Sequence, residues 1–124
     1  MPKPAAKAKD TIFATDTHLL NGSPMELPFL GIIDGDLSPN VLVEKKYAAM
    51  VGTTATNTPV HLAPPGKTFD KPPSNQGVIV GGSGTVLINN RQAARDGDQA
   101  KTCNDPKDLP AGLVVAKSTV IIGG

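Results

Sequence analysis

Aromatic residues and cysteine are scarce in this sequence of 124 residues. Phe, Tyr and Trp together make up 3% of the chain, with three Phe, one Tyr and no Trp, so Val, Ile, Leu and Ala must fill the core. Cys103 is the single cysteine, which excludes an intramolecular disulfide framework and favours synthesis in a reducing compartment. A core of small aliphatic residues indicates strands that approach one another closely.

Long apolar runs and an excess of charge of one sign are also absent. The longest apolar runs, at 113–116 and 120–122, fall far short of the roughly 18 residues that cross a bilayer. Residues 1–10 are basic, but no apolar stretch of a signal peptide follows them. Twelve basic and eleven acidic side chains leave a net charge of +1, which removes the field that nucleic-acid binders use. We therefore expect a protein made in the cytoplasm without a signal peptide, and no nucleic-acid partner.

Glycine and proline, by contrast, are abundant. The chain has 13 Gly and 12 Pro, so one residue in five resists the interior of a helix, which excludes a helical bundle. Proline gathers in two segments, 59–73 and 104–110, which predicts stiff connecting loops. We expect one mainly β domain over residues 11–124, preceded by a mobile or docking tail at 1–10.

One strand–turn–strand pattern occurs more than once. Residues 41–56 align without a gap on residues 86–101, and each copy reads as a β-branched run, a polar turn, a return strand with an Ala-Ala pair, and a Gly turn. A truncated third copy lies at 112–122. Short hairpins are only marginally stable alone, so three of them need one another. The sequence predicts a small conical, pseudo-threefold body of short β-hairpins with Pro/Gly-rich loops.

Three residues are candidate metal ligands of the soft type: His18, His61 and Cys103. His61 and Cys103 each follow the return strand of their own repeat, so pseudo-threefold symmetry places them at the same end of the body. Zinc prefers four tetrahedral nitrogen and sulfur donors, and such a set can tie loops together. Lone His and Cys residues more often serve packing, and a Cys103–His61 nucleophile and base is an alternative without an identifiable third group.

The repeat also contains a recognisable signature at Gln92-Ala93-Ala94-Arg95. Together with the flanking segments 52–59, 71–77, 83–89, 102–106 and 118–123, it resembles the Pro-Ala-Ala-Arg signature of the PAAR-repeat family. Members of that family are small conical proteins that sharpen the spikes of type VI secretion systems and of related phage tail-like contractile injection systems. Gln92 stands where the signature has Pro.

The resemblance implies a zinc ion at the apex, held by three His and one Cys. Carried over residue by residue, it assigns His18, His61 and Cys103 as zinc ligands. A third histidine is missing, because Leu27 stands where related sequences often have His. Water, a carboxylate or a backbone carbonyl is left as the fourth donor.

The resemblance further implies a structural tip rather than an enzyme. One copy would cap the blunt end of a trimeric, VgrG-like spike, sharpen it for membrane piercing, contact the target membrane transiently and recruit effector cargo. Such a tip is assembled on the injection particle and delivered outside the cell. The alternative is a small zinc-binding β module or a metallohydrolase unrelated to a spike, whose metal would hold a reactive water.

Overall fold

The computed structural model describes residues 2–124 and consists of strands and connecting segments without a helix. No helix that could cross a membrane is found among these residues. The mainly β fold expected from the sequence is therefore confirmed. Twelve strands follow in order: β1 (Lys3–Pro4), β2 (Thr11–Leu20), β3 (Ser23–Gly35), β4 (Leu42–Val43), β5 (Lys46–Tyr47), β6 (Thr54–Asn57), β7 (Gln76–Ile79), β8 (Leu87–Ile88), β9 (Arg91–Gln92), β10 (Gln99–Thr102), β11 (Leu109–Val115) and β12 (Ile121–Ile122).

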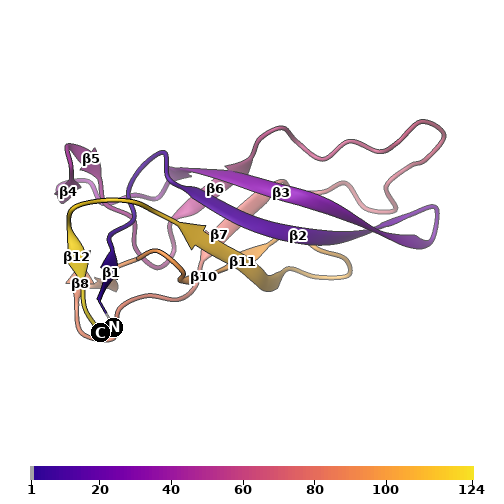
Figure 1. Ribbon diagram of the computed structural model, residues 1–124. Helices are drawn as coiled ribbons and strands as arrows, with labels where there is room; N and C mark the ends of the chain where they lie inside the picture. Colours follow the sequence, from indigo (N-terminus) through magenta and orange to yellow (C-terminus); the bar gives the residue numbers. More distant parts are fainter. Residues whose placement is uncertain (1) are drawn as a thin grey trace.

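Six strands close into a small barrel, and the other six form three short ribbons. The barrel order is β10-β11-β2-β3-β6-β7, with antiparallel pairing throughout. The ribbons are β1-β12, β4-β5 and β8-β9. They gather at one end of the elongated molecule, together with both chain termini (Figure 1). We call this end the base, and the opposite end, where the β2–β3 hairpin projects, the apex.

Three alanines hold the three ribbons around a common axis. The Ala6 N–H donates to the Ala94 carbonyl at 3.0 Å, the Ala94 N–H to the Ala49 carbonyl at 3.1 Å, and the Ala49 N–H to the Ala6 carbonyl at 2.9 Å. These bonds close a ring in which each backbone donates once and accepts once. All three alanines are fully buried, so a larger side chain has no room. The pseudo-threefold arrangement inferred from the repeats is thus present in the backbone.

The turn after each alanine pair repeats the same geometry. Lys9, Gly52 and Gly97 occupy the equivalent position with φ of 76°, 98° and 84°. This left-handed conformation suits glycine, and Lys9 is one of eight non-glycine residues that adopt it in the part of the chain that the structure describes. Each of the three residues donates its N–H to a residue that leads into the next ribbon: Lys9 to Ile33, Gly52 to Ile79 and Gly97 to Val114. The repeats therefore share turn chemistry even where their sequences differ.

Residues 3–10, which the sequence analysis assigned to a mobile or docking tail, lie packed against the rest of the chain. β1 pairs with β12 through Lys3↔Ile122 and Pro4↔Ile121, and Ala5 and Ala6 are buried. This segment supplies the return strand that the truncated third repeat lacks, because the chain completes its third hairpin with its opposite end. Met1 lies outside the described residues.

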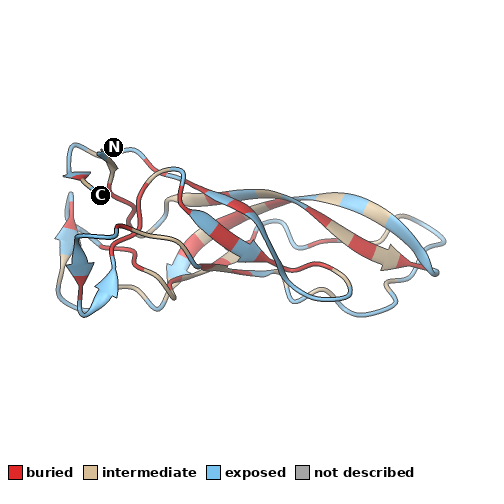
Figure 2. Ribbon diagram, turned by 90° about the horizontal axis from the view of Figure 1, so that it is seen from below, coloured by how far each residue is buried: buried red, intermediate tan, exposed pale blue. Residues whose placement is uncertain are grey.

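Small residues fill the core, as the shortage of aromatics predicts. Phe29 is the large exception, 1% exposed inside the barrel. Two glycines give its ring space: a Cβ on Gly31 would lie 2.7 Å from the ring, and a Cβ on Gly77 would lie 3.2 Å from it. The remaining barrel core consists of Ala, Ile and Val with Cys103. Figure 2 shows buried residues alternating with intermediate and exposed ones along the barrel strands, as expected where one face of each strand lines the core.

The β2–β3 hairpin is much longer than the short hairpins expected from the repeats. Its register runs without a break from Thr11↔Ile32 to Leu20↔Ser23, so it extends well beyond the strands of the barrel. The loop at 58–75 lies along the end of this hairpin, where Leu20 and Phe69 form a bridge and the Asp70 N–H donates to the Leu19 carbonyl at 2.8 Å. This pairing brings distant segments together at the apex.

We predict that Ala6→Leu destabilises the protein by about 1–3 kcal/mol, because the added side chain overpacks the closed alanine ring. Urea denaturation measures the change. Ala111→Leu is the matched control, since Ala111 is exposed on β11 and its replacement leaves the stability nearly unchanged. Equal midpoints for the two variants would show that residues 3–10 are a dispensable tail.

Candidate metal centre

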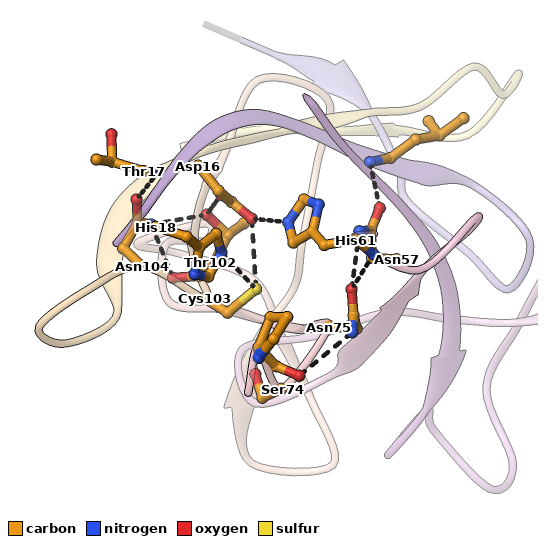
Figure 3. Close-up of polar contacts among 12 residues, drawn as sticks. Asp16, Thr17, His18, Asn57, His61, Ser74, Asn75, Thr102, Cys103 and Asn104 are labelled. Carbon is orange, nitrogen blue, oxygen red and sulfur yellow. Dashed lines mark hydrogen bonds and ion pairs between the residues drawn. The ribbon is translucent and has the colours of Figure 1, made fainter. Parts of the chain in front are cut away.

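Four metal-ligating side chains meet between the barrel and the apex: Asp16, His18, His61 and Cys103. Asp16 and His18 lie on β2 two residues apart, so both side chains point to the same, inner face of the strand. His61 comes from the loop after β6, and Cys103 directly follows β10. All four side chains are buried, and they converge in Figure 3.

The distances between the donor atoms suit a single metal ion. The Nε2 atom of His61 lies 2.9 Å from Oδ2 of Asp16, and the Cys103 Sγ lies 3.4 Å from the same oxygen. The Nε2 atom of His18 lies 3.7 Å from the Cys103 Sγ, and one ligand atom from each residue fits within 4.8 Å of all the others. Tetrahedral bonds of 2.0–2.3 Å place neighbouring donors about 3.3–3.8 Å apart. A buried cluster of this composition and spacing can bind a metal.

Neighbouring polar groups fix the positions of Asp16 and Cys103. The Thr102 hydroxyl donates to Oδ1 of Asp16 at 2.5 Å, which leaves Oδ2 directed at His61 and Cys103. The segment that carries Cys103 is fastened to β2, since the Thr17 N–H donates to the Asn104 side chain at 2.7 Å and the Asp105 N–H donates to the Thr17 carbonyl at 2.8 Å. The two donors are therefore held by hydrogen bonds before any metal binds.

The Nδ1 atom of His18 faces a second carboxylate, that of Asp105. Within residues 2–124, its Nδ1 atom is buried without a hydrogen-bond partner, and the Asp105 Oδ2 lies 3.6 Å from it. Histidines that ligate a metal through one nitrogen commonly present the other N–H to a carboxylate. The orphaned Nδ1 beside Asp105 thus fits a histidine whose Nε2 is a ligand.

Burial shifts the pKa values of Cys103 and His18 in the absence of metal. It raises the pKa of the Cys103 thiol to about 11, and the negative charge of Asp16 adds to the effect. Burial also lowers the pKa of His18 below its ordinary value, with a further contribution from His61. A metal cation reverses the balance at the sulfur, because it favours the thiolate over the thiol. The donor set therefore fits a divalent metal.

The structure brings together all three residues singled out from the sequence and adds Asp16. His18 lies within β2. Leu27 sits directly across from Asp16 in the β2–β3 register and is partly buried. Asp16 is therefore a carboxylate that lies beside the three predicted ligands, on the strand facing Leu27, and it is a candidate for the fourth donor. The alternation Asp16-Thr17-His18 was the signal for it.

The sequence is similar to one known protein family over a range that includes part of the base and one residue of the cluster. Residues 69–124 match the family model described as PAAR motif. The chain therefore carries a PAAR motif over this range. No curated protein matches the sequence. The region matched to the PAAR motif includes Cys103, whereas Asp16, His18 and His61 precede it.

The signature residues of the PAAR motif lie at the base, away from the metal cluster. Gln92 ends β9, and Ala93 and Ala94 belong to the buried core around the axis. Arg95 is buried and forms a bidentate pair with Asp98, with Nη2 to Oδ1 at 2.9 Å and Nε to Oδ2 at 3.1 Å. These residues build the fold, since none of them reaches the metal cluster.

The raised pKa of Cys103 predicts a particular pH dependence for its alkylation in metal-free protein. At pH 8 about one thousandth of a thiol with a pKa near 11 is ionised, so iodoacetamide reacts very slowly. The rate should rise about tenfold per pH unit up to pH 10, whereas an ordinary thiol levels off above about pH 9. Mass spectrometry of chelator-treated, folded protein follows the reaction, and a plateau near pH 9 would contradict the assignment.

Proposed function

We propose that this PAAR-motif protein caps and sharpens the trimeric spike of a contractile injection machine, with its base on the spike and its apex pointing outward. The observation that carries the proposal is the base itself. Leu42, Leu87 and Ile121 occupy equivalent positions in the three ribbons and are 56%, 61% and 56% exposed. Each precedes a buried residue, so each ribbon turns one apolar side chain to the core and one to solvent.

Three similar apolar side chains around one axis suit a partner with threefold symmetry. Each subunit of a trimeric, VgrG-like spike presents the same surface, and one copy of this chain can contact all three subunits at once. Exposed apolar groups clustered in this way commonly mark a protein interface. Tyr47, which pairs with Leu42 and is 51% exposed, adds an aromatic anchor of the kind that dominates interface energies.

We further propose that the cluster at Asp16, His18, His61 and Cys103 holds zinc. Thiolate, imidazole and carboxylate are all zinc donors, and four protein donors leave no open position for a reactive water, as in structural zinc sites. The ion would connect β2, the loop after β6 and the end of β10, so the segments that form the apex could not separate independently. This favours a mechanical role over the metallohydrolase alternative.

Recruitment of an effector protein is a second part of the proposal. Phe13 on β2 and Leu113 on β11 face each other across the strands on the outer wall of the barrel, and both are 51% exposed. Leu30 on β3 continues the row. This patch occurs on one side of the barrel only, so it does not match the threefold symmetry of a spike trimer. It suits a partner that binds once per tip.

In this role the protein is made in the cytoplasm and assembled on the injection particle. The particle then carries it out of the cell, and the apex makes transient contact with the target membrane. The function requires resistance to load and no catalytic step. Short strands, stiff Pro-rich loops and a metal staple all limit local opening.

The zinc assignment predicts about one zinc ion per chain in protein purified without chelators, measured by elemental analysis. Asp16→Ala should lose the metal and melt at a lower temperature, because zinc at one hundred times its dissociation constant stabilises the folded state by ~2.7 kcal/mol. Asp34→Ala is the control, since Asp34 is an exposed carboxylate on β3 outside the cluster. Wild-type protein without zinc would refute the assignment.

The capping role predicts one chain per spike trimer when the protein is mixed with the spike protein encoded beside it and measured by light scattering. Leu87→Asp at the base should abolish the complex, because a carboxylate would be buried in an apolar interface. Leu62→Asp is the matched control, since Leu62 is a more exposed leucine at 74%, in the loop of the apex. Loss of binding in both variants, or three chains per trimer, would count against the proposed orientation.

A further inference from the structure

Asn75 lies between two of the candidate ligands, His61 and Cys103, and is not one of the four candidate ligands itself. It ends the Pro-rich segment that precedes β7, and its φ of 57° places it in the left-handed region. Asparagine tolerates this conformation better than most residues other than glycine. This conformation directs the Asn75 side chain toward His61 and the Asn75 N–H toward Cys103.

The side chain of Asn75 holds the loop that carries His61. Its Oδ1 accepts the His61 N–H at 2.8 Å and the Asn57 Nδ2 at 3.0 Å, and its Nδ2 donates to the Pro73 carbonyl at 3.3 Å. The Asn75 carbonyl in turn accepts the Asn57 N–H at 2.8 Å. Asn57 continues the connection into the barrel, because its Oδ1 accepts the Leu30 N–H on β3 at 2.9 Å. His61 is thereby tied to β3 through two asparagines (Figure 3).

The backbone of the same residue reaches the other ligand. The Asn75 N–H and the neighbouring Ser74 hydroxyl face the Cys103 sulfur and lower the pKa of its thiol, although burial and Asp16 outweigh them. Donors directed at a sulfur stabilise it as a thiolate, the form that binds metal. One turn of the chain therefore binds the backbone of one ligand and faces the donor atom of another.

We propose that the Ser74–Asn75 turn is a positioning element that sets the separation of His61 and Cys103 and thereby determines metal affinity. This inference rests on the proposed metal site, and it adds two residues that are not ligands. The turn acts through the ligands by aiming the His61 ring and by supplying hydrogen bonds to the Cys103 thiolate. Groups in this second layer of a metal site typically contribute 10–100-fold to affinity.

The test compares Asn75→Gly with Asn89→Gly. Glycine keeps the left-handed backbone and the N–H at position 75 and removes only the side chain, so the side-chain hydrogen bonds to His61 and Asn57 are lost while the backbone bond to Asn57 stays. Asn89 is the matched control because it also has positive φ, at 50°, and also forms side-chain hydrogen bonds, but it lies in the turn between β8 and β9 at the base. Zinc affinity is measured on full-length protein by competition with a chromophoric chelator.

We expect the zinc dissociation constant of Asn75→Gly to rise about 10–100-fold at unchanged stoichiometry, and that of Asn89→Gly to match the wild type. Cobalt(II) supplies the second readout, because its sulfur-to-metal charge-transfer band reports the environment of the thiolate. That band should change in Asn75→Gly and stay the same in Asn89→Gly. Equal affinities and spectra for both variants would overturn the inference while leaving the metal site intact.

Two further outcomes remain decisive. Wild-type protein that binds no zinc overturns both the site and this inference. If metal-free Asn75→Gly does not fold, Ser74→Ala takes its place, because Ser74 is exposed and its truncation removes a single donor to the sulfur. A shifted charge-transfer band with weaker zinc binding in Ser74→Ala supports the inference, and a wild-type band and affinity overturn it.

Discussion

The closed ring of hydrogen bonds between Ala6, Ala49 and Ala94 is the constraint on which the rest of the molecule depends. Three backbones can meet at one axis only if their side chains are very small, and alanine meets that condition while keeping less conformational freedom in the unfolded chain than glycine. The ring fixes the directions of all three ribbons. The outward apolar residues of the base and the left-handed turns that lead into the barrel follow from it.

The apex does not follow the threefold symmetry of the base. The β2–β3 hairpin occurs once, and it supplies two of the four side chains in the metal cluster. In the metal-bound state, one carboxylate and one thiolate would balance the two charges of a divalent ion, so the buried site would be electrically neutral. Neutral sites avoid the large desolvation cost of an unpaired charge in the interior. Asp16 would supply one of the two negative charges that neutralise the ion.

The sequence predicted the repeated hairpins, the small-residue core and three members of the cluster, because these depend on local patterns and on residue types that are rare in the chain. It missed Asp16, because the alternation Asp16-Thr17-His18 indicates a shared strand face only once these residues are recognised as a strand, and the sequence context of His18 did not indicate one. It also missed the role of Pro4-Ala5-Ala6-Lys7, although this run resembles the signature at 92–95. The third repeat is divided between the two ends of the chain, and a search for contiguous copies overlooks a divided one. Zinc, the spike and the delivery route stay predictions.

The pairing of β1 with β12 has a consequence for the order of assembly. Lys3 and Ile122 are partners, so the third ribbon joins residues separated by almost the whole sequence. During translation the first strand leaves the ribosome long before its partner exists. Until β12 has been made, Ala49 and Ala94 follow complete ribbons, whereas Ala6 follows a strand without its partner. Contacts of such large sequence separation carry a high entropic cost of closure and slow the folding step that makes them. The base therefore forms as a finished surface only after synthesis has passed residue 122, which delays the exposure of a complete docking face.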